Sequence, residues 1–141
     1  MFQKILFASD GSENANNAAD ATLSLAQNLP DVEVILFHAS ADPPTRSELV
    51  QAGMDVSFLL RTKAKELLQS TEARFKEAGI SYTLQTGLGE PAQVIVDATK
   101  EHKIDLVIIG SRGLGSVNSL LLGSVSRRVA QDAPCPVMIV K

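Results

Sequence analysis

The sequence predicts an α/β fold in which helices cover both faces of a parallel sheet. Short apolar runs alternate with longer stretches of helical spacing along all 141 residues. This alternation is typical of βαβ units, in which helices connect parallel strands. The unbroken apolar run 106–109 also favours a parallel sheet, because a strand buried on both faces shows no polar alternation. We therefore expect a single domain, residues 1–141, built on an open sheet of five strands.

The first strand and the first helix follow from the spacing of apolar residues. Residues 5–8 are an apolar run that ends at the turn cluster 9–12. Apolar positions then recur at helical spacing, with Ser12 or Asn14 as the expected N-cap. The helix is expected to end at Pro30, which cannot continue it.

The second strand precedes the longest helical pattern of the chain. Residues 32–37 are the strand, and the proline-containing segment 38–44 is expected to be a loop. The helical pattern then spans 47–78, with charged residues covering most of its outer face. Gly53 interrupts the start of this pattern, so its first turn is expected to be separate, and Gly79 is expected to end it.

Three further strands and a helix come next. Residues 81–86 alternate in polarity like a strand, and the glycine-rich segment 87–89 is expected to turn. A helix should begin at Pro91, because proline is tolerated in a first turn. Residues 104–109 form the fourth strand, and Val137–Val140 form the fifth.

Composition excludes several classes of protein. The net charge of −3 gives no basic surface for nucleic acid, so we expect no nucleic-acid partner. No apolar run approaches the roughly 20 residues that span a bilayer, so we expect no membrane association. The single cysteine cannot form an internal disulfide, and the N-terminus lacks a signal-peptide pattern. The expected location is the cytoplasm.

The segment 110–126 is the strongest candidate for a site. This glycine- and serine-rich loop leaves the fourth strand and enters an expected helix, Ser124–Asp132. Free backbone N–H groups, small side chains and the positive end of a helix dipole suit an anion such as phosphate. A polar loop that binds nothing has the same composition, so both interpretations remain open.

Other polar residues are expected at the same edge of the sheet. Ligands of open α/β sheets bind outside the carboxyl ends of the strands, where the strand order reverses. Asp10 could accept hydrogen bonds from ribose hydroxyls or help to hold a metal ion, or it could simply stabilise a turn. Arg112 could reach a phosphate or stay in solvent, and His38 could pack in the fold or meet a ligand. Ser124 and Ser126 could cap the last helix or hold phosphate oxygens.

The familiar catalytic and nucleotide fingerprints are missing from the sequence. It contains no G-x-x-x-x-G-K-[ST] and no complete G-x-G-x-x-G, so neither a Walker-type NTPase nor a Rossmann dinucleotide site is expected. No histidine–cysteine cluster has metal-binding spacing, and no G-x-S-x-G elbow is present. We therefore name no catalytic residue and no protein metal site.

The pattern Gly110-x2-Gly113-x9-Gly123-Ser124 resembles that of the nucleotide-binding branch of the universal stress protein (UspA) family. The resemblance covers the whole chain, through segments that occur in the family's order. They are Lys4-Ile-Leu-Phe-Ala-Ser-Asp10-Gly-Ser12, Leu36-Phe-His38-Ala, Gly89-x-Pro-Ala-x-x-Ile95, Asp105-Leu-Val-Ile-Ile-Gly110 and Ala133-Pro-Cys-Pro-Val-Met-Ile-Val140. One departure is Ala39, which is smaller than the valine often found at that position.

This resemblance implies a fold, a ligand and an assembly. It implies the strand order 3-2-1-4-5 of the adenine nucleotide alpha hydrolase-like (HUP) fold and a homodimer paired through Val137–Val140. It implies ATP as the ligand, and Mg²⁺ or Mn²⁺ can accompany the phosphates. The implied nucleotide-binding residues are Ala8, Ser9, Asp10, Ala39, Gly110, Arg112, Gly113, Gly123, Ser124, Val125 and Ser126.

The roles of these residues follow from the same resemblance. Ala8 and Ala39 would contact adenine through their backbones, and Asp10 would lie by the ribose. Gly110, Arg112 and Gly113 would line the ribose and phosphate side, and residues 123–126 would hold the phosphates.

The expected function is that of a cytoplasmic, nucleotide-responsive stress regulator with an unidentified protein partner. A site made of backbone N–H groups should not turn ATP over quickly, because fast phosphoryl transfer needs charge stabilisation and an oriented nucleophile. The segment 41–56, with its paired prolines and Gly53, is a candidate lid. Two alternatives remain: a slow ATPase or phosphotransferase, and a dimeric interaction protein that binds no nucleotide.

Overall fold

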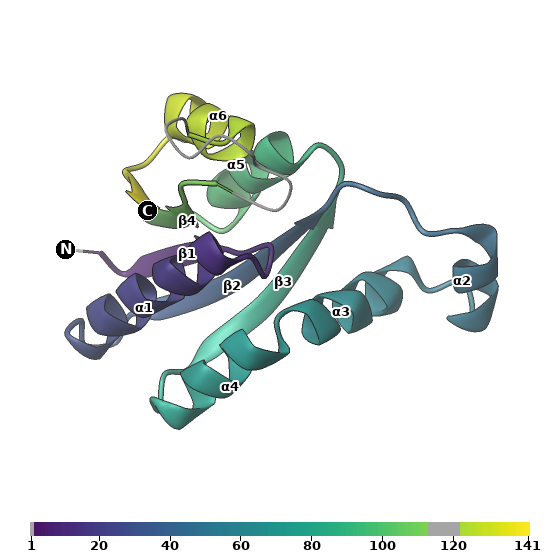
Figure 1. The fold of residues 1–141 in the computed structure, drawn as a ribbon, viewed down its shortest axis with the longest axis horizontal. Helices are drawn as coiled ribbons and strands as arrows, with labels where there is room; N and C mark the ends of the chain where they lie inside the picture. Colours follow the sequence, from purple (N-terminus) through teal and green to yellow (C-terminus); the bar gives the residue numbers. More distant parts are fainter. Residues whose placement is uncertain (1, 113–121) are drawn as a thin grey trace.

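A computed structural model describes residues 2–112 and 122–141 of the chain. Its centre is a parallel sheet of five strands in the order β3-β2-β1-β4-β5 (Figure 1). The strands are β1 (Lys4–Ala8), β2 (Glu33–Ser40), β3 (Tyr82–Leu88), β4 (Leu106–Gly110) and β5 (Val137–Val140). The helices are α1 (Glu13–Gln27), α2 (Arg46–Gln51), α3 (Val56–Leu67), α4 (Gln69–Glu77), α5 (Pro91–Glu101) and α6 (Ser124–Asp132). The predicted fold class and strand order are confirmed.

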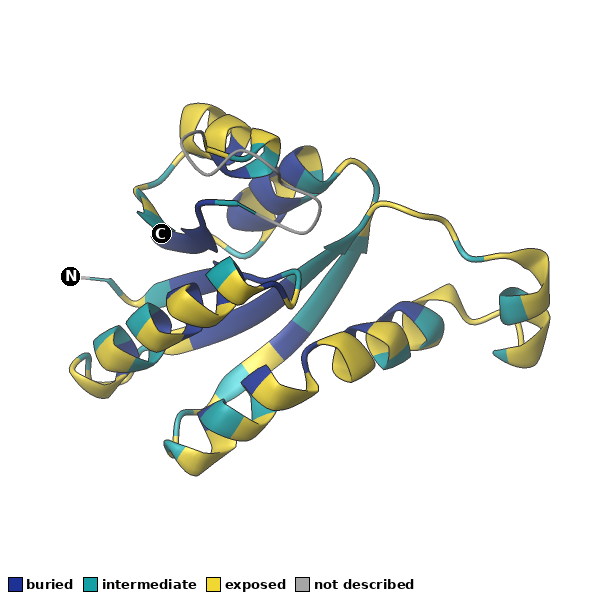
Figure 2. Cartoon of the chain, viewed as in Figure 1, coloured by how far each residue is buried: buried dark blue, intermediate teal, exposed yellow. Residues whose placement is uncertain are grey.

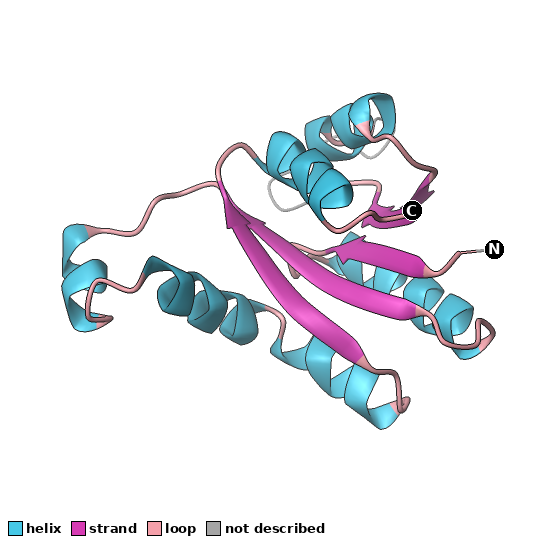
Figure 3. Ribbon diagram, turned by 180° about the vertical axis from the view of Figure 1, so that it is seen from behind, coloured by secondary structure: helices cyan, strands magenta, loops and turns pink. Residues whose placement is uncertain are grey.

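Helices cover both faces of the sheet, as Figures 1 and 3 show from opposite sides. Alternate residues of β1 point to opposite faces, because the side-chain period of a strand is two. Ile5 and Phe7 pack in the cluster that contains α1, α3 and α4, where the ring of Phe7 stacks on that of Phe75 at 6.2 Å. Leu6 and Ala8 pack in the cluster that contains α5 and α6. The central strands are buried on both sides, which explains their lack of polar residues (Figure 2).

The predicted helix 47–78 is divided into three helices in the structure. Left-handed turns at Gly53 (φ 65°) and Met54 (φ 64°) separate α2 from α3. A second break at Leu68, which the sequence pattern did not predict, separates α3 from α4. Leu68 is fully buried, so this bend turns an apolar side chain into the core while the helical hydrogen bonding nearly continues. The separate first turn before Gly53 was predicted correctly. The continuous helix expected after Gly53 was wrong, because helical spacing does not reveal a bend toward the core.

Two strands are longer than the sequence indicated. β2 continues to Ser40, although 38–44 was predicted to be a loop, and β3 continues to Leu88 through the predicted turn 87–89. The two extensions pair with each other, His38 with Thr86 and Ser40 with Leu88. Gly87 lets α5 pack closely against the extended end of β3, because a Cβ there would lie 2.3 Å from the side chain of Val94.

The helix ends largely follow the sequence signals. Ser12 caps α1, Pro91 occupies the first turn of α5, and Gly79 ends α4 in a left-handed conformation (φ 71°). In contrast to these packed helices, α2 extends away from the sheet (Figures 1 and 2) and buries none of its residues, all of which the structure describes. Within residues 2–112 and 122–141, no helix combines the length and the apolar character needed to cross a bilayer.

Candidate functional site

A cavity of about 640 Å³ opens where β1, β2 and β4 end. Ten of the eleven residues predicted for the site line it, and they come from four separate parts of the chain. They are Ala8, Ser9, Asp10, Ala39, Gly110, Arg112, Gly123, Ser124, Val125 and Ser126. The eleventh, Gly113, lies outside the described residues. The cavity exists because β1 pairs with both β2 and β4, which places the strand-order reversal at this edge of the sheet.

The inner wall of the cavity is apolar. Ala8 and Ile109 come from adjacent positions of the paired strands β1 and β4, and Phe37 comes from β2. Ile95 of α5 and Ala15 of α1 complete this wall, and all five residues are at most 7% exposed. Apolar surface of this kind suits an aromatic ring, because burying the ring against it removes apolar area from water.

The turn between β1 and α1 fixes the carboxylate of Asp10 at the cavity. The backbone N–H of Ser12 donates to Asp10 Oδ1 at 2.9 Å, and the N–H of Gly11 donates to Ser9 Oγ at 3.2 Å. His38 Nδ1 lies 3.0 Å from the carbonyl oxygen of Ser9, and because a carbonyl only accepts, this ring nitrogen carries the proton. His38 is therefore a hydrogen-bonded support of the turn.

The N-terminus of α6 differs from those of the other helices that begin at the cavity. In α1 the Ser12 hydroxyl accepts from Ala15 N, and in α5 the Glu90 carboxylate accepts from Ala92 N and Gln93 N. The N-cap of α6 is Gly123, and no described side chain accepts a hydrogen bond from the first turn of this helix. This first turn, at residues 124–126, therefore offers N–H groups and the positive end of a helix dipole to an anion.

The hydroxyl of Ser126 has a different environment from that of Ser124. Ser126 is 2% exposed, and its Oγ lies 2.9 Å from the carbonyl oxygen of Ser111 and 3.1 Å from that of Gly123. The N–H of Gly123 also donates to the Ser111 carbonyl, at 2.7 Å. These contacts join the start of α6 to the end of β4. They engage the single hydroxyl proton of Ser126, whereas the side chain of Ser124 is exposed.

Three charged side chains line the cavity in the described part of the chain: Asp10, Asp42 and Arg112. Within residues 2–112 and 122–141, no three His, Cys, Asp or Glu side chains gather as they would around a metal ion. A divalent cation in this cavity would therefore need ligands from a bound anion as well as from the protein.

The whole length of the chain, residues 1–141, matches the model of the Universal stress protein family. The chain belongs to the universal stress protein family. Universal stress protein YxiE of Bacillus subtilis is 31% identical over 149 aligned residues, covering 100% of both chains. A universal stress protein of Thermus aquaticus is 33% identical over 150 aligned residues, again covering 100% of both.

Solved structures of universal stress proteins share this fold. The structure of MJ0577 from Methanocaldococcus jannaschii has a TM-score of 0.80 at 28% identity, covering 100% of this chain and 96% of that one. A universal stress protein in complex with cAMP has a TM-score of 0.74 at 24% identity, covering 99% and 97% of the two chains. An Arabidopsis thaliana family member with AMP bound has a TM-score of 0.68 at 22% identity, covering 99% and 91%.

Sequence reasoning missed part of the wall of this universal stress protein's cavity. Pro91 and Ile95 reach the cavity from α5, and Ala41 and Asp42 reach it from the segment after β2. Phe37 and Ile109 could have been found, because they are the last residues of the predicted strands 32–37 and 104–109, whose carboxyl ends were expected at the site. No comparable signal marks Pro91, since its position depends on how α5 packs beside β2 and α6.

Proposed function

We propose that the cavity binds an adenine nucleotide, with ATP as the first candidate. The observation that carries the proposal is the N-terminus of α6, which has no side-chain cap and faces a cavity with an apolar inner wall. Such a wall suits a purine, and uncapped N–H groups suit phosphates. The related structures that hold AMP and cAMP add support, since both ligands contain adenine and phosphate.

In this proposal each wall of the cavity meets one part of the nucleotide. Ala8 and Ala39 contact the base through their backbones, and Asp10 accepts hydrogen bonds from the ribose hydroxyls. Gly110 and Arg112, with Gly113 beyond the described residues, line the ribose and phosphate side.

The first turn of α6 holds the phosphates. Gly123, Val125 and Ser126 contribute backbone N–H groups, and Ser124 can add its hydroxyl. The geometry favours the backbone of Ser126 over its hydroxyl, which already lies against the Ser111 carbonyl. Mg²⁺ or Mn²⁺ would bind together with the phosphates.

We infer a cytoplasmic regulator whose nucleotide-bound and empty forms differ in the segment 41–56. Ala41 and Asp42 line the cavity, while α2 just beyond them buries nothing. A bound nucleotide that contacts Ala41 would therefore act on a segment with little packing to resist movement. The test is limited proteolysis: ATP should slow cleavage within 41–56, and equal cleavage with and without ATP would refute this part of the proposal.

We propose that the protein forms a homodimer through β5. The two edge strands of the sheet, β3 and β5, differ in how much of their backbone is available to pair with a strand of another chain. At the β3 edge, the Arg61 guanidinium donates to the carbonyl of Leu84 at 2.7 Å and occupies an acceptor that another strand would need. At the β5 edge, Val137–Val140 is half-exposed, and a second β5 could pair with it.

Thermal unfolding with millimolar ATP and Mg²⁺, with GTP as the control, tests the central claim. A ligand at about 100 times its Kd stabilises a protein by roughly 2.7 kcal/mol. For 141 residues this is a rise in Tm on the order of 10 °C. A rise with ATP and none with GTP would support the adenine site. No rise with any nucleotide would favour the interaction-protein alternative.

A further inference from the structure

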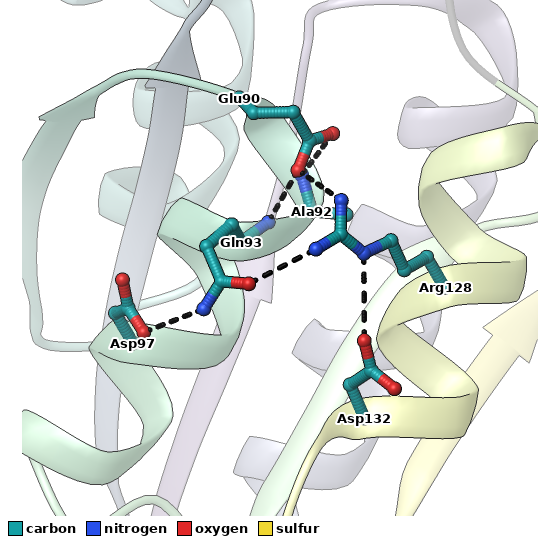
Figure 4. Close-up of polar contacts among 6 residues, drawn as sticks. All are labelled: Glu90, Ala92, Gln93, Asp97, Arg128 and Asp132. Atoms are coloured by element: carbon teal, nitrogen blue, oxygen red, sulfur yellow. Dashed lines mark hydrogen bonds and ion pairs between the residues drawn. The ribbon is translucent and has the colours of Figure 1, made fainter.

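A group of polar side chains joins α5 to α6 beside the cavity (Figure 4). Arg128 of α6 lies at its centre, with Nη1 2.8 Å from Glu90 Oε2 and Nη2 3.0 Å from Gln93 Oε1. Its Nε lies 3.4 Å from Asp132 Oδ2, one turn further along α6. Gln93 in turn donates to Asp97 at 2.8 Å. One guanidinium thus contacts two residues at the start of α5 and one in its own helix.

Glu90 serves both helices at once. Its carboxylate caps α5 by accepting from Ala92 N at 3.2 Å and from Gln93 N at 2.9 Å. The oxygen that accepts from Gln93 N also accepts from Arg128. Glu90 thereby caps the first turn of α5, whereas the first turn of α6, one turn before Arg128, has no side-chain cap. Arg128 therefore connects the capped N-terminus of α5 to the uncapped N-terminus of α6.

Apolar packing already holds the two helices together. Val129 of α6 is fully buried in the cluster that contains Ile95 and Ala98 of α5. The side chains of Arg128 and Glu90 are 44% and 52% exposed, so their ion pair adds little to the free energy of folding. A guanidinium that makes three directional contacts adds an orientational constraint to the one that apolar packing already sets. The contacts of Arg128 are thus suited to fixing the direction of α6 more than to keeping it folded.

We propose that Arg128 is a positioning residue that aims the first turn of α6 at the phosphates of a bound nucleotide. This inference rests on the proposed nucleotide-binding function. Arg128 does not line the cavity, so its effect passes through the helix that carries Ser124 and Ser126. A hydrogen bond to phosphate weakens steeply once the N–H direction departs from the acceptor. Losing Arg128 should therefore weaken phosphate binding and leave contacts to the base and the ribose intact.

The experiment measures the Kd of ATP and of adenosine by NMR titration of the full chain. The test variant is Arg128→Gln, and the matched control is Arg127→Gln, an equal charge change at the next residue. Arg127 is exposed, does not line the cavity, and its guanidinium has no partner among the described residues. Arg128→Gln should raise the Kd of ATP by about three- to fivefold, the upper part of the range that half-exposed ion pairs reach. The Kd of adenosine should stay within about twofold, and Arg127→Gln should change neither.

Arg128→Lys provides a second comparison that does not depend on the first variant folding. Lysine keeps the charge opposite Glu90 but cannot make three directional contacts, so an intermediate loss of ATP affinity is expected. Wild-type affinity in Arg128→Lys would refute the positioning role if Arg128→Gln does not fold.

Other outcomes separate this inference from the function on which it rests. If the wild type binds no ATP, the proposed function fails and the inference fails with it. If the wild type binds ATP and Arg128→Gln matches Arg127→Gln, only the positioning role is wrong. Equal weakening of ATP and adenosine would also overturn it, because a general loosening of the cavity would then explain the data.

Discussion

Two serines on one turn of α6 should respond in opposite ways to alanine substitution. Ser126→Ala removes a buried hydroxyl that lies 2.9 Å from the Ser111 carbonyl oxygen. That carbonyl keeps its hydrogen bond from Gly123 N at 2.7 Å, so no buried acceptor is left without a partner. The loss should be that of one ordinary hydrogen bond, about 0.5–1.5 kcal/mol. Ser124 is exposed and its side chain caps nothing, so Ser124→Ala should change stability by less than about 0.5 kcal/mol.

These free energies convert into measurable shifts in Tm. At roughly 2.1 cal/mol/K per residue, the unfolding entropy of 141 residues is about 0.3 kcal/mol/K. Ser126→Ala should therefore lower Tm by about 2–5 °C, and Ser124→Ala by less than about 2 °C. Differential scanning calorimetry without nucleotide measures both values.

For ATP affinity, the substitution with the larger effect is expected to be Ser124→Ala and not Ser126→Ala. Ser124→Ala should raise the Kd of ATP by about tenfold or more, because a hydrogen bond to a charged group contributes about 1.5–3 kcal/mol. Ser126→Ala should leave the Kd within about twofold, because its backbone N–H is unchanged. The reasoning is wrong if Ser126→Ala weakens ATP strongly at unchanged Tm, since its hydroxyl must then turn from Ser111 to the ligand.

Four further outcomes are expected from the structure. Hydrogen bonds from Lys63 and Thr45 lower the pKa of Glu48 from 4.5 to about 2, so its support of α2 should be complete above pH 4.5 and lost as the pH falls toward 2. NMR spectra of the α2 amides recorded against pH, with Glu48→Gln as the reference, check this expectation. Loosening of α2 near neutral pH would contradict it. Gly110→Ala would place a Cβ 3.0 Å from the Asn14 backbone and should cost about 1–3 kcal/mol, and an unchanged Tm would count against that close packing. Burial raises the pKa of the Cys135 thiol, so iodoacetamide should label it more slowly at pH 8 than it labels the unfolded chain, with equal rates as the contrary result. Met138→Glu should shift light scattering from dimer to monomer by placing like charges across β5, and an unaltered mass would argue against pairing at this edge.

The elements of the fold were largely predictable because their signals are local. Alternating apolar runs and helical spacing located every strand and most helix ends, and Ser12, Pro91 and Gly79 act as their residue types suggested. The break at Leu68 was not predictable, since a leucine at helical spacing has the same pattern whether or not the helix bends there. The length of β2 was also missed, because Ser40 is held by pairing with Leu88, which is distant in sequence.

The candidate site was also predictable where its signals are local and not where it depends on contacts between distant residues. The order of glycines and serines in 110–126 pointed to an anion loop, and the strand ends pointed to Ala8, Asp10 and Ala39. Nothing in the sequence indicated that Glu90 both caps α5 and binds Arg128 of α6, because the two residues are 38 positions apart. The sequence also left the hydroxyl of Ser126 undecided between a cap and a phosphate, and it did not indicate the contact with the carbonyl of Ser111.

The class of fold, the elements and the loop chemistry could all be predicted, since each depends on residues close together in the chain. The cavity enclosed by the ends of β1, β2 and β4, with Pro91 and Asp42 in its wall, is evident only from the folded structure. The same holds for the uncapped start of α6 and for the contacts by which Arg128 holds this helix against α5. Cavities and helix-to-helix contacts arise from packing between distant segments, which local spacing does not encode.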